Sequence, residues 1–107
     1  MITAEEIILI NNEITQGKAV VISNPASCIS SYDYYESTEK QIASIVRAVI
    51  KNHCFSDGNK RTGLAVLYLL AEINDIKIKA NDMAELIERI ASSKMSVEEI
   101  SKSFFRE

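Results

Sequence analysis

The chain has 107 residues, of which 47% are hydrophobic and 25% charged, and this composition excludes a disordered or fibrous protein. A formal net charge of −3 supplies no basic field for a polyanion, so we expect no direct binding of nucleic acid. The longest apolar run, Leu64 to Ala71, is far too short to span a membrane. Two cysteines in a chain that starts without a cationic, apolar leader favour a cytoplasmic protein with free thiols. We therefore expect one domain over residues 1–107 with a single hydrophobic core.

The N-terminal part combines one helix with an irregular segment. Thr3 and Glu6 form a capping-box pattern, which predicts a helix from about Ala4 toward Glu13. Residues 15–37 then contain a glycine, an Asn-Pro pair, a β-type run at residues 19–22 and a cluster of serines and tyrosines. This mixture predicts a loop or a short β-hairpin.

A surface helix is expected after the irregular segment. Thr38 with Gln41 repeats the capping pattern and predicts the start of this helix. Apolar residues then recur at helical spacing, so one face should pack on the core, and His53 lies on the continuation of that face. The apolar stripe consists of Ile42, Ile45, Val46, Val49 and Ile50.

Three more helices are expected in the second half of the chain. The first begins near Asn59, and its body from Leu64 to Ile73 is apolar nearly all round, which predicts the buried centre of a bundle. After a short extended piece at residues 76–78, a helix from about Asp82 and a last helix from Ser96 each present one apolar face. These faces consist of Met83, Leu86, Ile87 and Ile90, and of Val97, Ile100 and Phe104. The predicted fold class is all-α.

The stretch from His53 to Arg61 carries most of the chemistry, and it reads His-Cys-Phe-Ser-Asp-Gly-Asn-Lys-Arg. Its Ser-Asp-Gly turn precedes the central helix, so backbone N–H groups without intrahelical partners gather there and the helix dipole attracts anions. We therefore expect Gly58, Asn59, Lys60 and Arg61 to bind a phosphate. Gly58 lets the backbone approach the ligand closely, Lys60 adds a point charge, and Arg61 adds a planar fork that suits phosphate oxygens.

Three other residues of this stretch have candidate roles. Asp57 is a suitable Mg²⁺ ligand, because Mg²⁺ usually takes one or two carboxylates and completes its shell with water and nucleotide phosphates. His53, the only histidine, could accept the proton of an attacking hydroxyl group. Phe55 is expected to point inward and anchor the turn.

Each of these residues has a commoner explanation when it is taken alone. A histidine that ends an apolar stripe is usually a core or capping residue, an Asp-Gly pair is usually a turn, and cations at a helix start usually face solvent. The ordered set is far more specific, and a bound anion would offset two cations at the positive end of a helix dipole. A zinc site of Cys28, His53 and Cys54 is a weak competitor, because adjacent ligands lack the usual gap of two to four residues.

Written as H-x-F-x-D-G-N-K-R, the stretch from His53 to Arg61 resembles the signature of the Fic/Doc family. Its Asn-Lys-Arg ending is similar to that of the Doc (death-on-curing) branch, whereas Fic adenylyltransferases have Asn-Gly-Arg. The resemblance is strongest from Thr38 to Phe105 and implies a compact Fic/Doc-like helical bundle that uses ATP and Mg²⁺. It also implies that His53 is the catalytic base, that Asp57 binds Mg²⁺, and that residues 58–61 bind the nucleotide phosphates.

For function, the resemblance implies a toxin of a toxin–antitoxin module. Doc-type toxins are protein kinases that transfer the γ-phosphate of ATP to elongation factor Tu and so inhibit translation, which makes a Thr or Ser hydroxyl of such a translation factor the expected acceptor. Fic relatives instead transfer AMP to a hydroxyl side chain, and this is the alternative. Lys60 in place of glycine, and Leu64 in place of a second arginine, favour phosphoryl transfer. A nucleotide- or antitoxin-binding module with little catalysis is a second alternative.

The resemblance also suggests how the protein would be inhibited and how it would hold its target. The sequence lacks the family's self-inhibitory pattern, a Ser or Thr followed four residues later by Glu and then Gly or Asn, so a cognate antitoxin is expected to inhibit in trans. A flap that aligns the target peptide is expected between residues 21 and 35, with Val21, Ile22, Tyr32 and Tyr34 as candidate contacts. This region looks shorter than in the family, and the tyrosines could equally cover the edge of the bundle.

Overall fold

The computed structural model describes residues 1–105, and within them the chain forms five α-helices and two short 3₁₀ helices. The α-helices are α1 (Ala4–Thr15), α2 (Thr38–Lys51), α3 (Asn59–Ile73), α4 (Met83–Ser92) and α5 (Val97–Phe105), and the 3₁₀ helices are η1 (Pro25–Cys28) and η2 (Tyr32–Tyr34). One isolated β-bridge is the only strand-like pairing in these residues. The prediction of an all-α helical bundle is confirmed.

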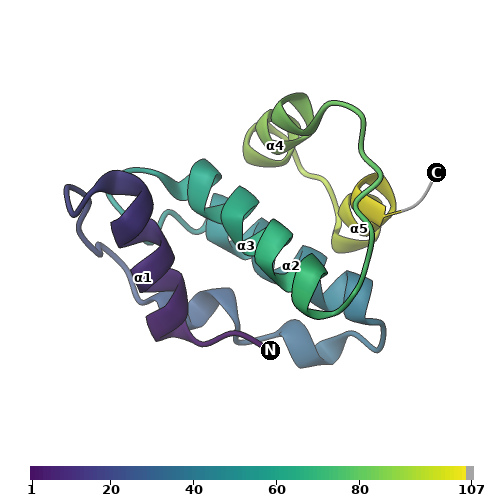
Figure 1. The fold of residues 1–107 in the computed structure, drawn as a ribbon, viewed down its shortest axis with the longest axis horizontal. Coiled ribbons are helices and arrows are strands. Elements are labelled where there is room, and N and C mark those ends of the chain that lie inside the picture. Colours follow the sequence, from purple (N-terminus) through teal and green to yellow (C-terminus); the bar gives the residue numbers. More distant parts are fainter. Residues whose placement is uncertain (106–107) are drawn as a thin grey trace.

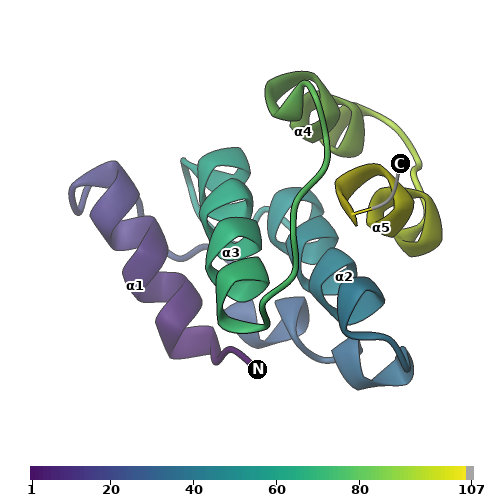
Figure 2. The same ribbon diagram turned by 45° about the vertical axis from the view of Figure 1, so that its right-hand side comes forward.

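The centre of the molecule is the pair α2 and α3, which pack against each other: α2 lies behind α3 in Figure 1, and the two stand side by side in Figure 2. Helix α1 packs on α3, while α4 and α5 pack on α2, so the helices share one core. The apolar stripe predicted on α2 is buried. Gly63 in α3 permits a close approach of the two helices, because a Cβ atom there would lie 2.6 Å from Cγ1 of Ile50. The end of α2 and the start of α3 are thereby held next to each other.

Capping boxes precede two of the helices. Oγ1 of Thr3 accepts the N–H of Glu6 at 3.1 Å, and the Glu6 carboxylate accepts the N–H of Thr3 at 2.8 Å. Ser96 and Glu99 make the same reciprocal pair ahead of α5. The predicted start of α1 is therefore confirmed, although the helix continues to Thr15 rather than ending near residue 13.

Helix α2 is capped one residue earlier than the sequence pattern indicates. Oγ of Ser37, not of Thr38, is the cap: it accepts the N–H of Lys40, in the first turn of the helix, at 3.2 Å. Gln41 completes no capping box, because its amide donates instead to the carbonyl of Tyr35 at 2.9 Å. The prediction of Thr38 as the cap was wrong because both residues can cap a helix and only the path of the preceding loop selects between them.

The segment between α1 and α2 is a loop and not a β-hairpin. Its β-type run pairs with the loop after α2: Val21 forms an antiparallel bridge with Phe55, and the N–H of Ile22 donates to the carbonyl of Cys54 at 2.8 Å. Residues 23–37, where the second strand of a hairpin would lie, contain η1 and η2 instead. The β-type run at residues 19–22 is therefore hydrogen-bonded to the signature stretch at residues 53–61.

Helix α3 is not buried all round, so that part of the sequence-based expectation was wrong. Its inward residues Val66, Leu67, Leu70 and Ala71 are buried, but Tyr68, Leu69 and Ile73 are 50%, 39% and 65% exposed. Neighbouring helices cover only part of its circumference: α3 lies between α1 and α2, and its surface between these two contacts stays open (Figure 2). None of the helices in residues 1–105 has both the length and the hydropathy of a membrane span.

The chain between α3 and α4 has no regular structure, so the piece expected at residues 76–78 pairs with no strand. The N–H of Lys79 donates to the carbonyl of Phe104 at 2.7 Å, which ties this connection to α5. Helices α4 and α5 bury the apolar faces that the sequence predicts, with Ile90 and Ile100 fully buried. Helix α4 thereby lies beside the start of α3.

Candidate functional site

The signature stretch forms the loop between α2 and α3. Helix α2 ends at Lys51, Asn52 follows as its C-cap, and His53 has a φ of 49°, which lies in the left-handed region. This turn takes the chain off the helix axis, so the exposed side chain of His53 does not continue the buried stripe of α2. The expectation that His53 lies on that stripe was wrong because the helix stops before it.

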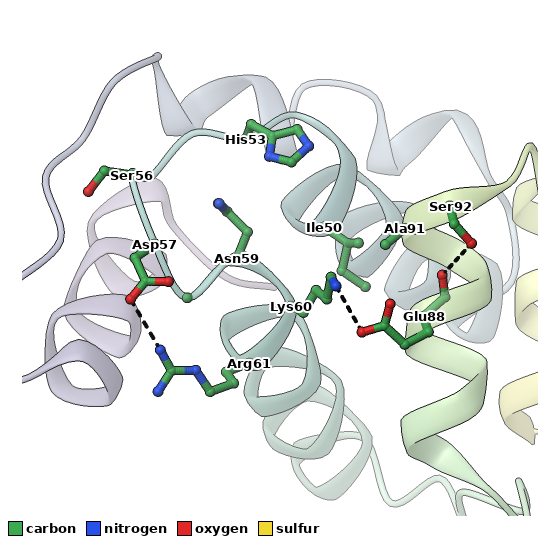
Figure 3. Close-up of a pocket in the computed structure, with 11 residues that line it drawn as sticks. Ile50, His53, Ser56, Asp57, Asn59, Lys60, Arg61, Glu88, Ala91 and Ser92 are labelled. Atoms are coloured by element: carbon green, nitrogen blue, oxygen red, sulfur yellow. Dashed lines mark hydrogen bonds and ion pairs between the residues drawn. The ribbon is translucent and has the colours of Figure 1, made fainter.

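A pocket of about 530 Å³ opens over this loop. It brings together His53, Asp57 and residues 58–61, which are the candidate residues of catalysis, metal binding and phosphate binding. Figure 3 shows His53 on one side of the pocket, Asp57 with Arg61 on another, and Lys60 reaching toward α4. The remaining lining residues are Ile50, Ser56, Glu88, Ala91 and Ser92.

The other predicted residues lie outside the pocket lining. Phe55 is only 2% exposed and points into the core beneath the loop. Val21 and Ile22 are exposed beside the loop, where they pair with it, and Tyr34 is 81% exposed on η2. Tyr32 is partly buried against the core. The candidate flap residues therefore lie along the outer edge of the loop and on η2.

The loop rests on buried polar groups of α1 and α3. Nδ2 of Asn11, which is 2% exposed, donates to the carbonyl of Asp57 at 2.9 Å and to Oγ1 of Thr62 at 3.1 Å. Thr15 lies one turn further along α1, and a Cβ atom added to Gly58 would come within 2.8 Å of its methyl group. Because buried polar groups require partners, these contacts fix the shape of the turn. We call Asn11, Thr15 and Thr62 the loop floor.

Asn59 closes the loop on itself. Its Oδ1 accepts the N–H of Phe55 at 3.2 Å, and its Nδ2 donates to the carbonyl of Phe55 at 2.9 Å. This double hydrogen bond holds together the two ends of the turn at residues 56–58. The amide group of Asn59 is thus used within the loop, and the group that this residue can offer to an anion is its backbone N–H.

Charged side chains surround the mouth of the pocket, and we call Asp57, Lys60, Arg61 and Glu88 the loop rim. Nζ of Lys60 lies 2.8 Å from Oε2 of Glu88, and Nη2 of Arg61 lies 3.5 Å from Oδ2 of Asp57 (Figure 3). Each of these side chains is at least 50% exposed. Gly58 gives α3 no side-chain cap, so the first backbone N–H groups of the helix remain open to an anion. The rim therefore places exchangeable charges around a helix N-terminus.

Two thiols lie behind the loop. Sγ of Cys28 and Sγ of Cys54 are buried 3.6 Å apart and form no disulfide, as the sequence predicts. Burial and the neighbouring Cys54 raise the pKa of the Cys28 thiol to about 12. His53 faces the pocket instead, and residues 1–105 hold no group of three or more His, Cys, Asp or Glu side chains placed to bind a metal. The zinc alternative was wrong.

A model of the Fic/DOC family matches residues 2–71, which include α1 with the loop floor, the whole signature loop and most of α3. The chain belongs to the Fic/DOC family. It is also similar to Toxin Doc of Mycolicibacterium smegmatis (strain ATCC 700084 / mc(2)155), with 26% identity over 84 residues, or 75% of this chain and 65% of that toxin. The chain thus spans just under two thirds of the length of this relative. The resemblance was expected to be strongest over residues 38–105, but the family model begins at residue 2 and ends at residue 71, so it includes α1 and does not reach α4 or α5.

Asp57 is the carboxylate of this Fic/DOC loop that suits Mg²⁺. It lines the pocket, its side chain is 72% exposed, and its side-chain partner is the exposed guanidinium of Arg61. A single protein carboxylate is enough for Mg²⁺, which fills its other positions with water and phosphate oxygens. The residues present therefore fit a magnesium ion that arrives together with a nucleotide.

The sequence reasoning missed the loop floor and Glu88. Asn11 lies four residues after Ile7, on the inward face of α1, so a polar residue at a buried helical position was a readable signal. Thr62 follows directly after the signature and could have been read as the partner of such a residue. The role of Glu88 could not be predicted from the sequence, because Glu88 lies on the polar face of amphipathic α4 and only tertiary packing brings it to Lys60.

Proposed function

We propose that this protein is a Doc-like toxin of a toxin–antitoxin module that acts as an Mg²⁺-dependent protein kinase. It would transfer the γ-phosphate of ATP to a Thr or Ser hydroxyl of a translation factor of the elongation factor Tu type. The observation that carries the proposal is that one pocket is lined by His53, Asp57, Lys60 and Arg61 around the N-terminus of α3. Membership of the Fic/DOC family and the similarity to a Doc toxin support the same class of function.

The phosphate chain of ATP would lie over the start of α3. Backbone N–H groups after Gly58 would donate to its oxygens, while Lys60 and Arg61 would exchange their carboxylate partners for phosphate. Asp57, released from Arg61, would hold the Mg²⁺ ion. When bound, the ion offsets phosphate charge and polarises the phosphoryl group that is transferred.

His53 would act as the base. The acceptor oxygen forms a bond to the γ-phosphorus while the bond from this phosphorus to the bridging oxygen of ADP breaks, and the hydroxyl proton moves to the imidazole. No side chain within residues 1–105 holds the His53 ring by a hydrogen bond, and its exposure at the pocket leaves a nitrogen accessible to an incoming hydroxyl. A positioned base of this kind contributes about 10²–10⁴ in rate.

Two positions favour phosphoryl over adenylyl transfer. Where Fic relatives have glycine, Lys60 extends its charge across the pocket toward α4. Where they have a second arginine, Leu64 is partly buried against the core and supplies no cation for the far end of a triphosphate. The inhibitor would be an antitoxin chain, and both the target and the antitoxin would place the protein in the cytoplasm.

The test is intact-protein mass spectrometry of purified elongation factor Tu, and of a bacterial lysate, after incubation with this protein, ATP and Mg²⁺. The controls are His53→Ala and His53→Asn, because asparagine tolerates the left-handed backbone of this position without acting as a base. A phosphoryl addition that both variants lose supports the kinase. Addition of AMP would instead identify an adenylyltransferase. ATP binding without any addition to a protein would support the nucleotide-binding module.

A further inference from the structure

Glu88 is the one rim residue that comes from outside the signature loop. It lies on α4, beyond the residues that the family model matches, and its Oε2 is 2.8 Å from Nζ of Lys60. The other ion pair of the rim, between Asp57 and Arg61, is local to the loop and longer, at 3.5 Å. The shortest ion pair at the pocket therefore joins the proposed phosphate-binding lysine to a different helix.

The backbone of Glu88 is held in place, although its carboxylate is exposed. Nζ of Lys51, at the end of α2, donates to the carbonyls of Ile90 at 3.2 Å and Ser93 at 2.7 Å, and so ties the C-terminal end of α4 to the end of α2. The Glu88 side chain itself is 63% exposed. It can turn away from Lys60 toward solvent, but its helix keeps it at the pocket, which it lines on the side opposite Asp57 (Figure 3).

A carboxylate in this place opposes a bound phosphate in two ways. It occupies a donor of Lys60 that the phosphate needs, and after release it remains a negative charge within the same pocket. Both effects are limited by solvent, because exposed charges are screened and an exposed ion pair is weak. The opposition should also grow with the charge of the ligand, so metal-free ATP is affected more than its Mg²⁺ complex.

We propose that Glu88 is a specificity-determining residue of the phosphate site: it competes for Lys60 and selects the Mg²⁺-complexed nucleotide over free polyphosphate. The inference rests on the proposed function only in requiring that residues 58–61 bind phosphate. It predicts that removing the Glu88 charge strengthens binding, whereas a residue that merely orients Lys60 would weaken it when removed.

The test is isothermal titration calorimetry of the full chain with ATP in EDTA and with ATP in excess Mg²⁺, at low salt and in 0.5 M NaCl. Glu88→Gln is compared with Glu85→Gln, which removes an equal charge from the same helix but lines a different cavity. Lys60→Met serves as the control for phosphate binding. We expect Glu88→Gln to bind metal-free ATP roughly two- to fivefold more tightly, with a smaller gain for the Mg²⁺ complex. The gain should shrink in high salt, and Glu85→Gln should match the wild type.

The two proposals fail in different ways. If the wild type binds ATP and Lys60→Met weakens that binding, the phosphate site stands, and a Glu88→Gln affinity equal to or below that of Glu85→Gln overturns the role of Glu88. If neither the wild type nor Glu88→Gln binds ATP, or if Lys60→Met binds as tightly as the wild type, the phosphate site itself is overturned, and the role of Glu88 with it.

Discussion

The floor and the rim hold the same loop by opposite means. On the floor, Asn11 is buried, and its amide donates one hydrogen bond to the loop carbonyl of Asp57 and another to the hydroxyl of Thr62 within the floor. On the rim, Lys60 and Arg61 make ion pairs that are at least half exposed. A buried polar group that loses its partner costs about 1–3 kcal/mol, whereas an exposed ion pair contributes about 0.2–1 kcal/mol. The buried floor therefore determines the shape of the turn, while the exposed rim cations can exchange their carboxylate partners for a ligand.

The largest effect is expected from breaking the floor at Asn11. Asn11→Leu leaves the carbonyl of Asp57 and the hydroxyl of Thr62 without their donor in a buried site, and should lower the free energy of unfolding by about 3 kcal/mol. Asn12→Leu, the exposed neighbour on the same helix, is the control and should change it by less than about 0.5 kcal/mol. Urea unfolding measures both. Equal small losses would show that the loop does not depend on α1.

Gly58 tests whether the floor contacts the turn as closely as the structure indicates. Its φ is 77°, and a Cβ atom would lie 2.8 Å from Cγ2 of Thr15, so Gly58→Ala combines backbone strain with a clash and should cost about 2 kcal/mol. Gly17→Ala has nearly the same φ, 75°, but its nearest contact is 3.6 Å, so it should cost about 1 kcal/mol.

A second substitution separates the clash from the strain. Thr15→Ser removes the offending methyl group and keeps the hydroxyl that donates to the carbonyl of Asn11 at 2.9 Å. In the Thr15→Ser background, Gly58→Ala should therefore cost about as much as Gly17→Ala. An unchanged cost in that background would mean that strain at Gly58, and not the floor, excludes alanine. Thermal or urea unfolding of the four variants decides between the two.

The sequence predicts what local rules determine. Helical periodicity and caps locate α1, α4 and α5 closely, and the ordered residues from His53 to Arg61 identify the loop that lines the pocket. The errors occur where a neighbour far along the chain decides. The run at residues 19–22 has β-propensity, but its partner is the signature loop and not an adjacent strand, so no local pattern could reveal the pairing.

The rim shows the same limit at the level of single side chains. The sequence predicts that Lys60 and Arg61 lie at the start of a helix, but it does not predict both carboxylates with which they pair when no ligand is bound. Asp57 lies four residues before Arg61, which is a regular helical spacing, whereas Glu88 lies 28 residues after Lys60 and is brought there by the packing of α4. The charge balance of the pocket thus required the tertiary structure.

The buried thiols of Cys28 and Cys54 test whether water is excluded behind the loop as well. The pKa of Cys28 rises from an ordinary 9.0 to about 12, so between these values the unfolded chain loses a proton that the folded chain keeps. The free energy of unfolding should therefore be unaffected below about pH 9 and should fall as the pH rises toward 12. Between pH 8 and pH 10 the wild type should lose about 1 kcal/mol more than Cys28→Ala in urea unfolding. Parallel losses would mean that water reaches the Cys28 thiol.

The smallest effect on stability, and the sharpest contrast with the floor, is expected at Lys60. Lys60→Met removes an exposed ion pair and should change the free energy of unfolding by less than about 1 kcal/mol, while ATP affinity falls about tenfold or more. Lys40→Met is the matched control, because Lys40 pairs with Glu98 at 3.3 Å on another surface and has similar exposure. It should have the same small effect on stability and none on ATP. A loss of 2 kcal/mol or more for Lys60→Met alone would place Lys60 with the floor, because a residue that shapes the loop cannot also be free to exchange its partner for a ligand.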